Sequence, residues 1–181
     1  MNRVIDPYQR DIYSGTAVQD MIRNFVAGVP FGTFLLPIKY DAWGRPSNFA
    51  DKSNAQGLLE RSLLNFIAPF IRTREDQDAL TREVLRLHEA VKKDFGNDML
   101  PSIAPKSVDG YRLSGQGYEW YSRRMGELQY NYASNAIRSP SYRNAQSSGK
   151  VKILKDAYAK ARKQAKEELV RQDFYKPEIL P

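Results

Sequence analysis

Apolar residues recur every three or four positions along several stretches of the chain, which is the spacing of one face of an amphipathic helix. The pattern predicts a first helix over 16–27 and a second that begins at Ser53 and stops before Pro69. A third helix is predicted from Thr73 to a stop at Gly96. None of these stretches alternates in the way that a half-buried strand does.

Two further helices are predicted towards the C-terminus. Ser114 is expected to cap the fourth helix, which ends at Ser139-Pro140, and the last and longest helix runs from about Lys150 to Asp173. The apolar positions of this last helix form a narrow stripe of Leu154, Tyr158, Ala161, Ala165 and Leu169. A thin seam that contains alanine suits antiparallel pairing or a helical bundle.

The stretch 29–52 lacks any repeating pattern but is rich in apolar and aromatic side chains. An irregular segment of this length is uncommon inside a compact domain. Its apolar surface must be buried, either on the helices of the same chain or on a neighbouring subunit. Because one buried Phe or Leu contributes on the order of 1.5–3 kcal/mol, we interpret the stretch as an arm that docks firmly without regular structure.

The pattern as a whole predicts an all-α fold of amphipathic helices with a long irregular aromatic-rich arm, extended rather than compact. We expect an N-terminal helix and arm over 1–52, a helical hairpin over 53–96, a linker over 97–113 and C-terminal helices over 114–181. The last helix is the basic one, since positive residues outnumber negative ones within it.

Composition narrows the class of protein further. The 181-residue chain is 41% hydrophobic, which argues against a fully disordered protein, and its mean hydropathy of -0.61 indicates a thin core. There is no cysteine, so disulfides and thiolate metal sites are excluded. The polar N-terminus indicates no signal peptide, and no apolar run is long enough for a membrane-spanning helix.

The residues that could carry chemistry do not form a recognisable active site. His88 is the only histidine, and one histidine without cysteine cannot make the usual zinc sites. Glu119 beside Trp120 lacks a second carboxylate placed to act with it as a glycosidase would need. Gly115-Gln-Gly117 lacks the third glycine and the Lys-Ser/Thr pair of a phosphate loop. We therefore predict no enzymatic activity, no cofactor and no metal.

Two binding interpretations remain, and the net charge of +7 is compatible with both. Tyrosines interleaved with arginines over 111–143 are typical of protein interfaces and also of single-stranded nucleic-acid binding. We favour the interface, since no OB-like strand pattern is present. The predicted interface residues are Phe34, Leu36, Tyr40, Trp43, Tyr118 and Tyr121. The alternative is nucleic-acid binding, with contacts predicted at Lys152, Lys155, Arg162, Lys163 and Lys166.

A series of landmarks along the chain resembles a known family. Leu36-Pro37-Ile38-Lys39-Tyr40-Asp41-Ala42-Trp43-Gly44-Arg45-Pro46 resembles an LP-x-x-x-D-x-x-G-x-P segment near the C-terminal end of very large tailed-bacteriophage proteins. The resemblance continues through Asn65 to Phe70, Ser114 with Tyr118 and Tyr121, Gly126, Ile137 to Tyr142 and the Lys/Ala/Arg helix over 150–166. The proteins that it resembles are internal virion, DNA-ejection or tape-measure-like polypeptides.

This resemblance implies an architectural, non-enzymatic role. By it, the chain is expected to be a virion protein of the internal core, neck or genome-ejection apparatus. The expected partners are copies of itself and other phage virion proteins, with DNA contact as a further expectation. The expected location is the virion, or the host cell envelope after ejection.

Overall fold

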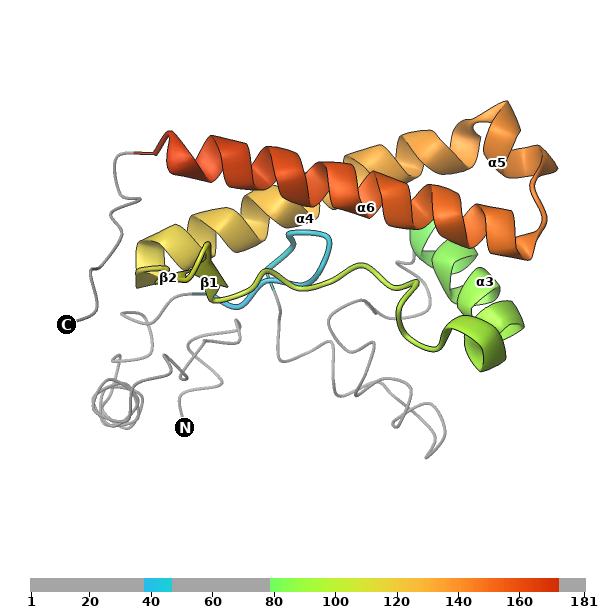
Figure 1. Ribbon diagram of the computed structural model, residues 1–181, viewed down its shortest axis with the longest axis horizontal. Coiled ribbons are helices and arrows are strands. Elements are labelled where there is room, and N and C mark those ends of the chain that lie inside the picture. Colours follow the sequence, from blue (N-terminus) through green and yellow to red (C-terminus); the bar gives the residue numbers. More distant parts are fainter. Residues whose placement is uncertain (1–37, 47–78, 173–181) are drawn as a thin grey trace.

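The computed structural model describes residues 38–46 and 79–172 (Figure 1). Within them lie four helices, α3 (Ala79–Phe95), α4 (Gly115–Arg138), α5 (Pro140–Asn144) and α6 (Ser147–Val170), and two short strands, β1 (Ser107–Val108) and β2 (Tyr111–Arg112). The prediction of an all-α fold is confirmed for this part of the chain. The helices predicted over 16–27 and from Ser53, and the arm residues Phe34 and Leu36, lie outside the described residues.

The long helices α4 and α6 lie side by side and form the body of the fold (Figure 1). They are connected through α5, which reverses the chain direction. The predicted seam of α6 is confirmed, because its five residues are at most 1% exposed: Leu154, Tyr158, Ala161, Ala165 and Leu169. The helix begins at Ser147, ahead of the predicted Lys150, and ends at Val170, short of the predicted Asp173.

Serine side chains mark the helix boundaries at both ends of α4. The Ser114 hydroxyl accepts a hydrogen bond from the Gly117 backbone N–H at 3.1 Å, which confirms the predicted N-cap. Ser139 ends α4, as predicted, and its hydroxyl also caps α5 by accepting from the Tyr142 N–H. The short helix α5 was not predicted, although Ser139 followed by a proline is a good helix start.

Helix α3 packs one face against α6 and α4 near the α5 end of the hairpin. Its apolar residues at helical spacing are all buried: Leu80, Val84, Leu87 and Val91. The helix ends at Phe95, and the Gly96 N–H bonds back to the Lys92 carbonyl at 3.0 Å, which confirms the predicted stop. Its predicted start at Thr73 lies outside the described residues.

The segment 97–113, predicted as a linker, packs along the helices and buries Met99, Ala104 and Val108. It also contains the antiparallel pair β1–β2, in which Val108 pairs with Tyr111. Asp109 and Gly110 join the strands with φ of 53° and 81°. Two consecutive positive φ values define a type I′ turn, and Asp-Gly favours that turn. The Asp109-Gly110 dipeptide is therefore a sequence signal for this hairpin, although the spacing of apolar residues gives no sign of it.

Candidate interaction surfaces

Residues 38–46 form a compact turn that is stabilised by its own hydrogen bonds. The Asp41 carboxylate accepts from the backbone N–H groups of Trp43 at 2.9 Å and Arg45 at 2.8 Å. The Asp41 N–H donates to the Arg45 carbonyl at 2.9 Å, and Tyr40 forms an isolated bridge with Pro46. Aspartate favours such turns because its short side chain reaches the N–H groups that follow it. The turn therefore has internal hydrogen bonds of its own, in addition to its contacts with the helices.

This turn docks on α4 through two glycines. A methyl group placed on Gly126 would lie 1.9 Å from the Gly44 nitrogen, and one placed on Gly44 would lie 2.3 Å from the Arg123 carbonyl oxygen. Both distances are far below van der Waals contact, so the two backbones approach as closely as they do only because neither residue has a side chain. Gly44 also has φ of 75°, which disfavours any other residue there.

The close approach places the aromatic residues of the turn in the core of the same chain. Trp43 is 3% exposed, packs edge-on against Tyr130 at 5.8 Å between ring centroids, and also contacts Tyr158. Tyr40 is 8% exposed and donates from its hydroxyl to Glu119. Two residues predicted as interface anchors therefore contribute to the intramolecular core. The sequence left open whether the arm packs on helices of the same chain or on a neighbouring subunit. Residues 38–46 of the arm pack on helices of the same chain.

Gln129 of α4 joins three segments at the centre of the molecule. The side chain is fully buried, and its amide Nε2 donates to the carbonyl oxygens of Ala42 at 2.9 Å and Ser102 at 3.0 Å. These two carbonyls belong to the docked turn and to the segment after α3. Because a buried carbonyl without a donor is costly, this one amide holds both irregular segments against α4. No sequence signal distinguished this glutamine from a solvent-exposed one.

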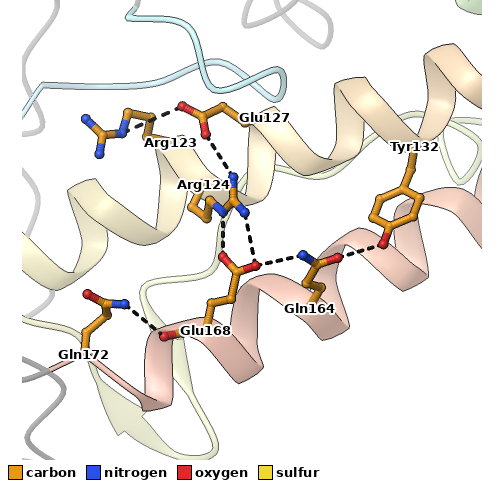
Figure 2. A network of polar contacts seen from close by, with 7 residues as sticks. All are labelled: Arg123, Arg124, Glu127, Tyr132, Gln164, Glu168 and Gln172. Carbon is orange, nitrogen blue, oxygen red and sulfur yellow. Dashed lines mark hydrogen bonds and ion pairs between the residues drawn. The ribbon is translucent and has the colours of Figure 1, made fainter.

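A polar network connects α4 to α6 along one side of the hairpin (Figure 2). Arg124 forms a two-pronged pair with Glu168, with donor–acceptor distances of 2.6 and 3.1 Å. Gln164 donates to the same carboxylate and accepts from the Tyr132 hydroxyl at 2.7 Å. The Arg124 guanidinium is the main cause of a lowered pKa at Glu168. The network fixes the register of the two helices, because a shift of one turn would break the Arg124–Glu168 pair and the Tyr132–Gln164 bond.

A second polar cluster joins α5 to α3. The Tyr142 hydroxyl donates to Glu83 at 3.0 Å, and Arg86 forms a bidentate pair with the same carboxylate at 2.8 Å. Hydrogen bonding from Arg86, together with Tyr142, lowers the pKa of Glu83, while burial raises the pKa of the Tyr142 phenol. Lys150 lies over the Tyr142 ring at 5.2 Å. These contacts anchor the α5 end of the hairpin.

The basic residues predicted to contact nucleic acid divide into two groups. Lys152, Lys155 and Lys163 are exposed on α6 and make no ion pair within the described part of the chain. Lys166 instead pairs with Asp109, and Arg162 donates to the Ser102 hydroxyl at 3.3 Å. The exposed face of α6 is thus basic and unneutralised mainly over its first two-thirds.

The end of the α4–α6 hairpin that lies away from α5 carries exposed apolar groups. Tyr111 on β2 is 42% exposed, and Val170 at the end of α6 is 51% exposed. Tyr118 is half-buried and lies beneath the Lys106 ammonium group, while Tyr121 is only 4% exposed. Of the two predicted interface tyrosines on α4, Tyr121 therefore belongs to the core. Neither Tyr111 nor Val170 was predicted as an interface residue.

The described residues bring no catalytic arrangement together. His88 is buried on α3, and its Nε2 lies 3.2 Å from the Asn97 side-chain oxygen, which is a structural contact between a helix and the loop that follows it. No group of three or more His, Cys, Asp or Glu residues that could hold a metal ion occurs over 38–46 and 79–172. A shallow depression lined by Ser102, Ile103 and Arg162, among others, contains no convergent acid–base pair.

No helix in the described part of the chain is long and apolar enough to span a membrane. Comparison with protein-family models, with curated proteins and with solved structures finds no match to this chain. The structure itself defines an all-α protein in which the long helices α4 and α6 pair and the turn 38–46 docks on α4. Basic residues are exposed on α6, and apolar residues are exposed on β2 and at the C-terminal end of α6.

Proposed function

We propose that this chain is a non-enzymatic structural component of a tailed-bacteriophage virion. It acts by assembly with copies of itself or with larger virion proteins, in the internal core, the neck or the genome-ejection apparatus. Its site of action is the virion, or the host cell envelope if it is ejected with the genome.

The observation that carries this proposal is that two landmarks of the phage resemblance, far apart in the sequence, meet in space. Gly44, from the LP-x-x-x-D-x-x-G-x-P segment, lies against Gly126, which is a separate landmark more than 80 residues later. Ser114 caps the helix that carries Gly126, and Tyr142 is buried where that helix turns back. Their convergence supports the assignment of the sequence pattern to a real structural unit.

The surface supports an assembly role at the end where β2 and the C-terminal end of α6 lie. Tyr111 and Val170 are large exposed apolar residues, and Trp120 and Tyr118, near Tyr111 in sequence, are only half-buried. Tyrosine and tryptophan are enriched in protein interfaces, where they supply large contact areas. We assign the assembly contact to this apolar end, in place of the buried Tyr40, Trp43 and Tyr121.

Incorporation into particles tests the proposal. A phage that lacks its own copy of the chain is complemented with the wild type or with the double variant Tyr111→Asp/Val170→Asp, and purified particles are probed for the chain. Because both side chains are exposed, the variant should keep its helical circular dichroism, and we expect at least a tenfold loss of incorporation. The control variant Asn131→Asp/Asn144→Asp makes the same change in charge at exposed positions elsewhere and should be incorporated normally. Normal incorporation of the Tyr111/Val170 variant would contradict the assigned interface.

A further inference from the structure

The basic residues of this chain are concentrated at the α5 end of the hairpin and along α6. From 128 to 155 the chain has five basic residues and no acidic one: Arg138, Arg143, Lys150, Lys152 and Lys155. From 150 to 166 it has seven basic residues and the single acid Asp156. Most other helical charge is balanced locally, as at Glu83–Arg86, Glu89–Lys92 and Arg124–Glu168. The excess of positive charge therefore lies in the segment from Arg138 to Lys166.

Four lysines of α6 are exposed to solvent. Lys152, Lys155, Lys160 and Lys163 are all exposed, and none forms an ion pair within the described part of the chain. Asp156 lies four residues from both Lys152 and Lys160 and pairs with neither. At about 1.5 Å of rise per residue, the stretch from Lys152 to Lys163 extends over about 16 Å. We name these four residues the α6 lysine stripe.

The stripe is held rigidly by the packing on the other side of the helix. Leu154, Tyr158, Ala161 and Ala165 are at most 1% exposed and fix α6 against α4. The Arg124–Glu168 pair and the Tyr132–Gln164 bond prevent the helix from sliding (Figure 2). A row of cations on a fixed helix can contact a regularly spaced row of anions without first becoming ordered.

The chemistry of the stripe distinguishes between polyanionic partners. The exposed residues between its lysines are Asp156, Ala159 and Arg162, none of which is a bulky apolar residue. The large exposed apolar residues of the described part of the chain, Ile103, Tyr111 and Val170, lie outside the stripe. Membrane-surface helices need bulky apolar side chains beside their lysines. Binding of single strands relies on exposed aromatic rings, but Tyr142 on α5 and Tyr158 on α6 are buried, and the exposed Tyr111 lies on β2. Of the polyanionic partners considered, the stripe therefore best fits one that it contacts through phosphate groups alone.

We propose that the α6 lysine stripe binds the phosphate backbone of double-stranded nucleic acid without reading its sequence. Each lysine acts as a point charge towards one phosphate and releases a counterion on binding. Arg138 and Arg143, at the α5 end, extend the positive surface beyond the helix. Arg162 and Lys166 contribute less, because Ser102 and Asp109 already engage them. This inference does not depend on the proposed virion role.

The test is binding of the full chain to a 30-base-pair duplex of arbitrary sequence as salt is varied. The variant Lys152→Gln/Lys155→Gln/Lys163→Gln is compared with the control Lys39→Gln/Arg82→Gln/Lys93→Gln, which makes the same charge change at exposed sites. Removing three phosphate contacts should lower the slope of log affinity against log salt by about 2.7 and weaken binding about 500-fold at 0.1 M salt. The control should bind within about threefold of the wild type.

Three results would overturn the proposal. The first is equal weakening in both triple variants, which would show that only net charge matters. The second is tighter binding to a single strand of the same length than to the duplex. The third is binding to phosphatidylserine vesicles with none to duplex. Circular dichroism of every variant verifies that the helices are intact. Particle incorporation of the stripe variant is measured separately, so loss of duplex binding with normal incorporation would support this inference and leave the assembly role unaffected.

Discussion

Replacement of Gly126 by alanine should undock the turn 38–46 from α4. The added methyl group would lie 1.9 Å from the Gly44 nitrogen, 2.4 Å from its Cα and 2.5 Å from the Trp43 carbonyl carbon. All three are backbone atoms, so no side-chain rotation can relieve the overlap. The turn has to move away as a unit, because its internal hydrogen bonds through Asp41 keep it compact.

The magnitude follows from what the turn buries. Trp43 is 3% exposed when docked, and a buried Trp removes roughly 150–250 Å² from water, which corresponds to an upper bound of about 4–6 kcal/mol. Loss of the Gln129 hydrogen bond to Ala42 adds to this cost. Alanine stabilises a helix interior by about 1 kcal/mol relative to glycine, which offsets part of the loss. We expect a net loss of about 3 kcal/mol in the free energy of unfolding.

The assay uses Trp43 as its own reporter. The chain has two tryptophans, so Trp120→Phe leaves a single one in the turn. In this background, Gly126→Ala should shift the emission of Trp43 to the red and open it to acrylamide quenching under native conditions, while helical circular dichroism persists. Gly149→Ala is the matched control, because its methyl would meet only the Ala145 side chain at 3.2 Å. A Gly126→Ala protein as stable as the wild type, with Trp43 still protected, would refute the close-approach argument.

Three other substitutions probe the polar contacts. Gln129→Met keeps the side-chain volume but leaves the Ala42 and Ser102 carbonyls without their hydrogen-bond donor. Urea denaturation should therefore show a loss of about 2–3 kcal/mol in the free energy of unfolding. An unchanged free energy of unfolding would contradict the stabilising role assigned to Gln129. The lowered pKa of Glu168 means that its pair with Arg124 stabilises the fold above the usual carboxyl value of 4.5, and that this contribution disappears as the pH falls through the lowered pKa. Stability measured from pH 6 to pH 3 should therefore fall less in Glu168→Gln than in the wild type, and identical curves would contradict this. Tyr142→Phe removes one hydrogen bond to Glu83 and should cost about 1 kcal/mol by thermal denaturation, with a larger effect in the wild type than in a Glu83→Gln background.

The helical part of the fold was predictable because it is encoded in local periodicity. The seam of α6 from Leu154 to Leu169 repeats at helical spacing, and all of it is buried. Ser114 and Gly96 are residue types that end helices for local chemical reasons, and both do so. These features need no information about distant parts of the chain.

The docking of the turn could not be predicted in the same way. Gly44 and Gly126 are compatible with many local structures, and only their contact explains why both lack a side chain. Burial of Trp43 followed from its apolar character, but the sequence left its destination open between the same chain and a partner. The Asp109-Gly110 turn is a different case, because its local signal was present. The sequence identified the last helix as basic, but it did not show which of its lysines form ion pairs. The Lys166–Asp109 ion pair, for example, depends on the tertiary fold.

The most direct measurement of the proposed virion role is quantitative mass spectrometry of purified particles of a phage whose genome contains the gene for this chain, before and after triggered genome release. We predict that the chain is present in full particles in a fixed ratio to the major capsid protein. Depletion from emptied particles would assign it to the ejected internal proteins, and retention would assign it to the neck or another fixed component. Its absence from both kinds of particle would contradict the virion role.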